Sequence, residues 1–180
     1  VSPGCPEDMT AYSREFKTLG ISYIFDPGQS IPVLSGDRIA EMITGARMLI
    51  SNDYELEMIM KATGLTHNAI LERTPAIVTT LGEKGSLVCT RDKATPVPAV
   101  QALCVVDPTG AGDSYRAGFL SAYVRGYPSL TCCKIGTVTA SFVVEHVGCQ
   151  THLPDWKTME TRYRQNFGLL EDRSHQGSQA

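Results

Sequence analysis

The stretch DPTGAGDSYRAGF, residues 107–119, places small and flexible residues directly in front of a carboxylate and an apolar helix. The flexible residues are Gly110, Ala111 and Gly112, and the carboxylate is Asp113. A helix that begins in this way offers backbone N–H groups and the positive end of its dipole to an anion. A carboxylate beside such an anion cradle indicates a group that accepts a proton. Phosphoryl transfer to a hydroxyl requires both parts.

The same stretch resembles the signature of the PfkB/ribokinase family, which contains ATP-dependent sugar and nucleoside kinases. The matching residues are Asp107, Thr109 and the run 110–113, which stand between an expected strand and an expected helix. Pro108 and the run 115–118 are most similar to the adenosine-kinase-like branch of that family. The resemblance therefore implies a kinase that uses ATP.

By this resemblance Asp113 is the catalytic base, and Gly110, Ala111 and Gly112 form the anion hole. A base in this position takes the proton of the acceptor hydroxyl, which is worth roughly 10²–10⁴ in rate in comparable sites. A backbone donor in an anion hole is worth roughly 10²–10³ in kcat. The simpler alternative is that Asp113 only caps the helix, because aspartate is a preferred N-cap residue.

A second motif, Asn52-Asp53-Tyr54-Glu55, follows the expected strand 47–51. It resembles the NxxE motif of the family, which implies that Asn52 binds the nucleotide phosphates and that Glu55 places Mg²⁺ through water. Mg²⁺ keeps several waters and needs only one or two carboxylates, so this pair suffices. An asparagine followed three residues later by a glutamate at a helix start also resembles a capping box, and that alternative stays open.

A third motif, TLGEKG at residues 80–85, ends one expected strand and precedes another. It resembles the TLGxxG segment of the family, which implies that Thr80, Gly82 and Gly85 lie against the nucleotide. Glycines allow the backbone to approach ribose and phosphates closely. A plain β-turn explains the same letters, and no GKS or GKT closes the segment as in a Walker P-loop.

Asp107 and Thr109 match family positions that help bind a monovalent cation near the anion cradle. The resemblance therefore implies a K⁺ site with carboxylate and carbonyl oxygen ligands. Pro108 departs from the threonine that is commoner in the family, so the sequence leaves this K⁺ site open.

Segments of strand length alternate with segments of helical periodicity along the chain. We expect strands at 21–25, 47–51, 76–81, 86–90 and 102–106, and helices at 6–19, 35–45, 53–62, 113–125, 130–146 and 154–167. This alternation predicts an α/β fold, with a mainly parallel sheet flanked by helices on both faces. Each motif follows a strand end, and ligands of such sheets bind at the carboxyl ends of the strands, which predicts one shared site.

Composition excludes several classes of function. The chain has 180 residues, of which 42% are hydrophobic and 19% charged, and its net charge is −3. This balance gives no reason to expect nucleic-acid or membrane binding. The six cysteines are scattered through apolar segments, without a CxxC pair or a metal-ligand spacing. We therefore expect free thiols and a cytoplasmic protein.

The resemblance covers nearly the whole chain but only the later part of the family pattern. The glycine-rich substrate motif and the small β lid, which come first in the family, have no counterpart here. We interpret residues 1–168 as the C-terminal, nucleotide-binding portion of a ribokinase-like kinase domain, and we expect residues 169–180 to be a disordered tail. A sheet edge without its lid favours pairing, for example in a homodimer.

The favoured function is an ATP-dependent kinase that transfers the γ-phosphoryl group to a primary hydroxyl of a nucleoside, with adenosine as the first candidate. One alternative is a sugar kinase of the ribokinase or fructokinase type. Another is a non-catalytic nucleotide-binding or interaction module derived from a kinase, because a fragment without its acceptor pocket need not be active. Binding of ATP without transfer would favour this module.

Overall fold

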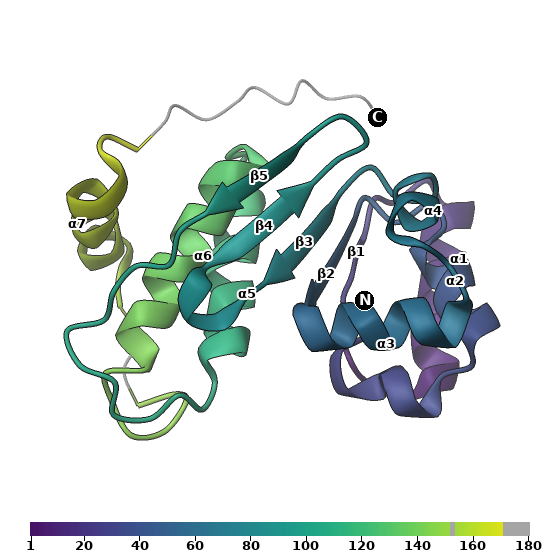
Figure 1. Ribbon diagram of the computed structural model, residues 1–180, viewed down its shortest axis with the longest axis horizontal. Helices are drawn as coiled ribbons and strands as arrows, with labels where there is room; N and C mark the ends of the chain where they lie inside the picture. The colour runs from purple at the N-terminus through teal and green to yellow at the C-terminus, as the bar shows by residue number, and fades with distance from the viewer. Residues whose placement is uncertain (152–153, 171–180) are drawn as a thin grey trace. The chain divides into compact units, whose positions relative to one another are not determined.

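The computed structural model describes residues 1–151 and 154–170, which form two compact units (Figure 1). The first unit contains residues 1–82 and 86–96, and the second contains residues 83–85 and the described residues from 97 onward. Each unit has its own buried apolar side chains. No helix in the described part of the chain is long and apolar enough to cross a membrane.

The sheet is mixed and mostly parallel. Its strands are β1 (Ile24–Phe25), β2 (Met48–Asn52), β3 (Ile77–Thr80), β4 (Ser86–Cys89) and β5 (Ala94–Val97), and they follow one another in this order. β1, β2 and β3 run parallel, whereas β4 runs antiparallel to β3. This topology confirms the predicted α/β class with a mainly parallel sheet, and the two strands that flank the TLGEKG turn pair with each other.

The first unit packs its helices and strands around one apolar core. Its helices are α1 (Pro6–Thr18), η1 (Gly28–Val33), α2 (Gly36–Ile43), α3 (Asp53–Thr63) and α4 (His67–Leu71), and η2 (Gly82–Lys84) follows β3. Phe25, Leu49 and Ile77 from the strands and Ile39 and Ile59 from the helices are all completely buried in this core. Burial of a side chain of this size contributes roughly 1.5–3 kcal/mol, so the core holds the strand ends in place.

The second unit contains α5 (Ala111–Tyr123), α6 (Ser129–Val143) and α7 (Trp156–Phe167). α5 and α6 lie side by side, and two glycines set their separation (Figure 1). A Cβ atom on Gly118 would overlap the hydroxyl of Thr139, and one on Gly136 would lie 2.9 Å from the carbonyl oxygen of Tyr115. This close packing fixes the direction of α5, whose first turn carries Asp113.

Arg162 of α7 contacts the C-terminal end of α6. The guanidinium of Arg162 lies 3.5 Å from the ring centroid of Phe142 and donates to the two carboxylate oxygens of Glu145 at 2.8 and 3.1 Å. The N–H of Leu103 also donates to Glu145, at 2.8 Å. Burial opposes the charge of Glu145, but these donors outweigh it and lower the pKa of the carboxyl. The same carboxylate therefore ties the loop before α5 to the end of α6.

The structure differs from the sequence prediction at two strands. The predicted strand 102–106 is absent, because the N–H groups of Val106 and Asp107 donate to the carbonyl of Val144 and not to a neighbouring strand. β5 was not predicted, because Pro96 interrupts its sequence. A proline fits there because β5 is the last strand in the sheet order, where one side of the ladder has no neighbour.

Candidate active site

The first turn of α5 begins at a glycine in the left-handed region. Gly110 is the N-cap residue, with φ of 81° and ψ of 2°, and no side chain caps the helix there. A Cβ atom on Gly110 would overlap the Cβ of Cys149. Both the backbone conformation and the close approach of Cys149 therefore require glycine at this position.

The backbone donors of this turn are only partly used within the helix. The N–H of Ser114 donates to the carbonyl of Gly110 at 2.8 Å, which is the first regular helical bond. The N–H of Ala111 donates to the carbonyl of Pro108 at 3.2 Å, so this predicted donor already takes part in the turn. The N–H groups of Gly112 and Asp113 precede the first regular helical bond, and helix geometry gives them no intrahelical acceptor. These two donors form the open part of the cradle.

Asp113 is the third residue of α5 and not its N-cap, so the interpretation that it only caps the helix is wrong. Its side chain is 84% exposed, and its Oδ1 atom accepts a hydrogen bond from Arg116 at 3.1 Å. Arg116 is a residue that the sequence analysis missed. Its spacing of three residues from Asp113 on a predicted helix is the signal that could have found it.

Asp107 joins two loops at the base of the cradle. Its Oδ1 atom accepts from the N–H of Thr109 at 2.9 Å, and its Oδ2 atom accepts from the N–H of Gly148 at 3.0 Å. The hydrogen bond from Gly148, followed by those from Thr109, lowers the pKa of the Asp107 carboxyl. Since Cys149 follows Gly148, this clasp keeps the loop after α6 against Gly110.

Asn52 and Glu55 form a complete capping box at the start of α3. The Asn52 Oδ1 atom accepts from the N–H of Glu55 at 2.7 Å, and the Glu55 Oε2 atom accepts from the N–H of Asn52 at 2.8 Å. The alternative structural explanation of this motif is therefore confirmed. Asn52 also lies opposite Thr80 in the parallel pairing of β2 and β3, so three of the predicted residues meet at these strand ends.

The glycines of the TLGEKG segment have backbone conformations that favour glycine. Gly82 opens η2 with φ of 59°, and Gly85 follows η2 with φ of 91°. A Cβ atom on Gly85 would overlap the carbonyl oxygen of Val97, whereas the space around Gly82 is open within 4 Å. Packing against the chain itself therefore explains Gly85, and only Gly82 has room beside it for a ligand.

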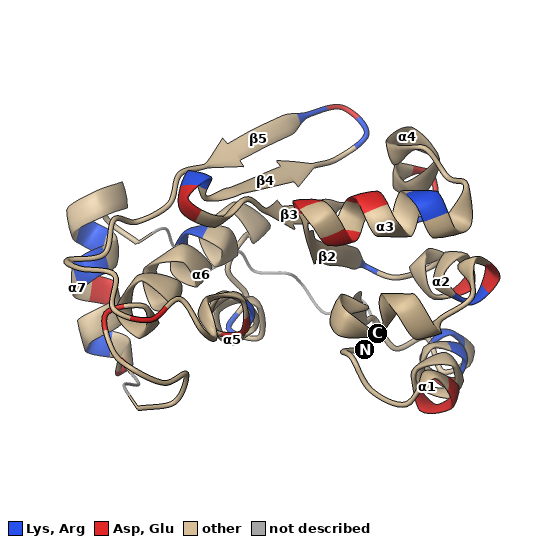
Figure 2. Ribbon diagram, turned by 60° about the horizontal axis from the view of Figure 1, so that its bottom comes forward, with Lys and Arg blue, Asp and Glu red and all other residues tan. Residues whose placement is uncertain are grey.

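The predicted site residues fall into two groups. Asn52, Glu55, Thr80 and Gly82 belong to the first unit, and Gly85, Asp107, Thr109 and the run 110–113 belong to the second. Within residues 1–151 and 154–170, no three His, Cys, Asp or Glu side chains are grouped to hold a metal ion. Figure 2 shows that the first half of α3, with Asp53 and Glu55, is acidic. A Mg²⁺ ion at Glu55 would have to take its other ligands from water and phosphate, which is the coordination that Mg²⁺ commonly accepts.

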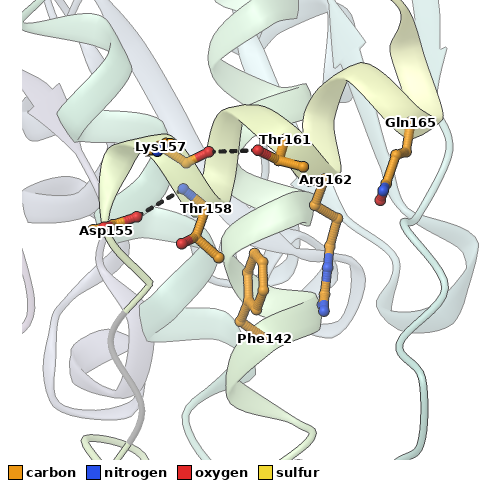
Figure 3. A pocket seen from close by; sticks show the side chains of 7 residues that line it. All are labelled: Phe142, Asp155, Lys157, Thr158, Thr161, Arg162 and Gln165. Atoms are coloured by element: carbon orange, nitrogen blue, oxygen red, sulfur yellow. Dashed lines mark hydrogen bonds between the residues drawn. The ribbon is translucent and has the colours of Figure 1, made fainter.

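A groove of about 510 Å³ lies between α6 and α7 (Figure 3). It is lined by Phe142, Asp155, Lys157, Thr158, Thr161, Arg162 and Gln165. None of the predicted site residues lines this groove. The Arg162 guanidinium in the groove is already paired with Glu145. The Asp155 carboxylate accepts from the N–H of Thr158 at 2.7 Å (Figure 3). The groove is therefore separate from the cradle.

The fold is shared with solved nucleoside kinases of ribokinase-like fold. The Methanocaldococcus jannaschii nucleoside kinase, an archaeal member of the ribokinase family, matches with a TM-score of 0.83 and 41% identity, over 91% of this chain and 55% of that one. The Burkholderia thailandensis nucleoside kinase in complex with inosine matches with a TM-score of 0.92 and 32% identity, over 97% of this chain and 57% of that one. The same enzyme in complex with ADP-inosine also has a TM-score of 0.92. The chain thus has a ribokinase-like fold.

The chain belongs to the pfkB family of carbohydrate kinases, whose family model matches residues 1–156. In sequence it is 48% identical over 138 residues to the nucleoside kinase of M. jannaschii, which is 77% of this chain and 46% of that protein. The chain therefore spans about half the length of the curated relatives it matches. The family and fold expected from the sequence are confirmed.

Proposed function

We propose that the protein acts as an ATP-dependent nucleoside kinase. The observation that carries this proposal is the start of α5, where a left-handed glycine cap, open N–H groups and an exposed carboxylate stand within one helical turn. The family membership and the similarity to nucleoside kinases support the same activity.

In the proposed reaction, Asp113 accepts the proton of a primary hydroxyl of the nucleoside. A bond forms between that oxygen and the γ-phosphorus of ATP. The bond between the γ-phosphorus and the β,γ-bridging oxygen breaks, and ADP leaves with that oxygen. The N–H groups around Gly112 stabilise the charge on the transferred group, while Gly110 and Ala111 shape the turn that presents them. Such donors act mostly on the transition state, so their loss reduces kcat more than substrate binding.

We propose that the strand ends of the first unit contact the nucleotide. Asn52, Thr80 and Gly82 would contact the phosphates and ribose, with Gly85 shaping the turn beside them. Mg²⁺, where bound, neutralises phosphate charge, and Glu55 would hold it through water. The acidic start of α3 and the open space at Gly82 support this assignment.

K⁺ remains a separate proposal at Asp107 and Thr109. Both oxygens of the Asp107 carboxylate already accept backbone N–H groups, yet a carboxylate has about four acceptor sites, so it could also hold a cation. The clasp is complete without the ion. We therefore expect K⁺ to modulate nucleotide binding and not to be required for folding.

The acceptor is proposed to be a nucleoside, with adenosine as the first candidate and inosine beside it, because a similar structure contains inosine. A sugar acceptor is the competing proposal, and a non-catalytic module is the alternative of another class. Phosphorylation of a panel of nucleosides and sugars, together with calorimetric ATP binding, separates the three. Transfer to a sugar alone would exclude the nucleoside, and ATP binding without transfer would identify the module.

The compartment and the assembly of the protein are proposed from one feature each. The six cysteines are thiols and not disulfides, which is typical of a reducing compartment and supports a cytoplasmic protein. The outer side of β1 is partly covered by Val1, whose carbonyl accepts from the N–H of Asp26 at 2.9 Å. The other edge, at β5, has no neighbouring strand in the sheet order, so a homodimer formed by sheet pairing would use β5, and sedimentation of the purified protein tests that assembly.

The substitution Asp113→Asn tests the proposed base. In the longest form of the protein that its gene encodes, we expect kcat to fall roughly 10²–10⁴-fold. Calorimetric ATP binding should change by less than about threefold, because the backbone donors remain. Asp37→Asn, which alters an exposed carboxylate in the first turn of α2, is the matched control and should keep wild-type activity. A D113N variant with more than a tenth of wild-type turnover would refute the role.

A further inference from the structure

Arg116 contacts the carboxylate that the proposed mechanism uses as base. Its Nη1 atom donates to the Asp113 Oδ1 atom at 3.1 Å, and the same Nη1 lies 3.5 Å from the place of a Cβ on Gly112. The guanidinium therefore lies over the first turn of α5, beside two of the residues of the cradle. We propose that Arg116 is a positioning residue for the catalytic base, an inference that rests on the proposed kinase function.

The exposure of the two partners argues for positioning. The side chain of Arg116 is only 26% exposed, whereas that of Asp113 is 84% exposed. The guanidinium is thus the more buried partner, and the carboxylate is open to solvent. Because Arg116 is paired with Oδ1, Oδ2 is the atom that accepts the proton of the hydroxyl.

A second helical ion pair shows what an ordinary surface pair looks like in the same unit. Arg164 and Glu160 lie four residues apart on α7, with 2.6 Å between nitrogen and oxygen and with side chains that are 56% and 30% exposed. There the arginine is the more exposed partner, and pairs of that kind contribute little to stability. In α5 the order is reversed, since the arginine is the more buried partner and the carboxylate the more exposed one.

Arginine suits this role better than lysine does. Its guanidinium is planar and rigid, and it stays charged, so it fixes the orientation of a carboxylate oxygen. A lysine in its place keeps the charge but presents a compact ammonium on a flexible stem. The residue at 116 should therefore affect the rate of proton acceptance more than the affinity for ATP.

The experiment compares Arg116→Gln, Arg116→Lys and the matched control Arg164→Gln in the longest form of the protein that its gene encodes. Activity with adenosine and inosine gives kcat and KM, calorimetry gives the Kd of ATP, and circular dichroism gives Tm. We expect R116Q to lower kcat about 10–100-fold with the KM and Kd of ATP within threefold of wild type. R116K should recover part of this loss, and R164Q should resemble wild type in every measurement.

The outcomes separate this inference from the proposed function. If D113N is inactive while R116Q turns over like wild type, Asp113 keeps its role and the positioning role of Arg116 is refuted. If R116Q loses ATP affinity and kcat in equal measure, Arg116 serves binding and the inference is also refuted. If R116Q alone is unfolded, R116K decides through the same split between kcat and KM. A wild-type protein that transfers nothing overturns the proposed function and this inference together.

Discussion

The first turns of α3 and α5 differ in how their backbone N–H groups are satisfied. Each helix leaves backbone N–H groups without intrahelical acceptors at its first turn. At α3, Asn52 and Glu55 close a capping box within the chain, with bonds of 2.7 and 2.8 Å. At α5, Gly110 supplies no side chain, and the acidic residue of the first turn pairs with Arg116.

This difference separates residues that serve folding from residues that serve a ligand. A capped helix start has its donors satisfied, so it gains little from an anion. A helix start without a side-chain cap keeps its N–H donors available for a ligand, but it is less stable. A bound phosphate accepts from these donors and restores the lost stability. We therefore expect changes at α3 to act mainly on stability and changes at α5 to act mainly on nucleotide binding and turnover.

The largest effect should come from Gly110→Ala. Alanine is strained in the left-handed backbone conformation of Gly110, and its Cβ would overlap that of Cys149. We therefore expect a loss of about 3 kcal/mol in the free energy of unfolding. ATP binding should weaken more than tenfold, because the turn must shift away from the phosphate. Urea unfolding and calorimetry measure the two effects.

Gly64→Ala is the matched control for that substitution. Gly64 ends α3 with φ of 69°, but nothing lies within 4 Å of the place of its Cβ. Only the backbone strain remains, so the expected loss is about 1 kcal/mol with unchanged ATP affinity. Equal losses in G110A and G64A would show that Cys149 does not restrict Gly110.

A medium effect is expected from Glu55→Gln, which separates the two interpretations of the second motif. Glutamine keeps the capping box, since its side-chain oxygen can still accept the N–H of Asn52. It removes the charge that a Mg²⁺ ion would use. We expect an unchanged Tm and a Mg²⁺ requirement that rises about tenfold in ATP-binding titrations, since such outer partners typically change metal affinity 10–100-fold.

Asn52→Ala provides the opposite comparison. It removes the cap, which costs about 1 kcal/mol of stability. Here the change in Tm should be larger than in E55Q. If E55Q loses stability while its Mg²⁺ requirement stays at the wild-type level, the motif serves folding alone.

The sequence predicted the elements whose ends carry local signals. α3 begins after Asn52 and ends at Gly64, as expected from a cap and a left-handed glycine. α1 likewise begins at Pro6. The loop before α5 was not predictable in this way, because its apolar residues favour a strand while its N–H groups bond the distant end of α6. Local propensity cannot anticipate such a tertiary partner.

In the candidate site, too, the local features were predictable from the sequence and the tertiary contacts were not. The run 110–113 is visible in the sequence because glycines and a carboxylate stand together before a helix. The clasp from Asp107 to Gly148 was missed, because these residues are 41 positions apart and meet only when α5 and α6 pack. Arg116 lies within a helical turn of Asp113, but the spacing alone does not distinguish a positioning residue from an ordinary surface pair.

The smallest expected effect is a pH dependence of stability, which arises from Asp107 in the loop before α5. Hydrogen bonds from Gly148 and Thr109 lower the pKa of this carboxyl in the folded protein, so folding favours its ionised form. Its stabilisation is fully present above the unfolded value of about 3.9 and is lost as pH falls through the lower folded value. The difference in Tm between wild type and Asp107→Asn should therefore be constant from pH 7 to about pH 5 and shrink below about pH 4. A gap in Tm between wild type and D107N that persists at low pH would mean that Asp107 acts through packing and not through its charge.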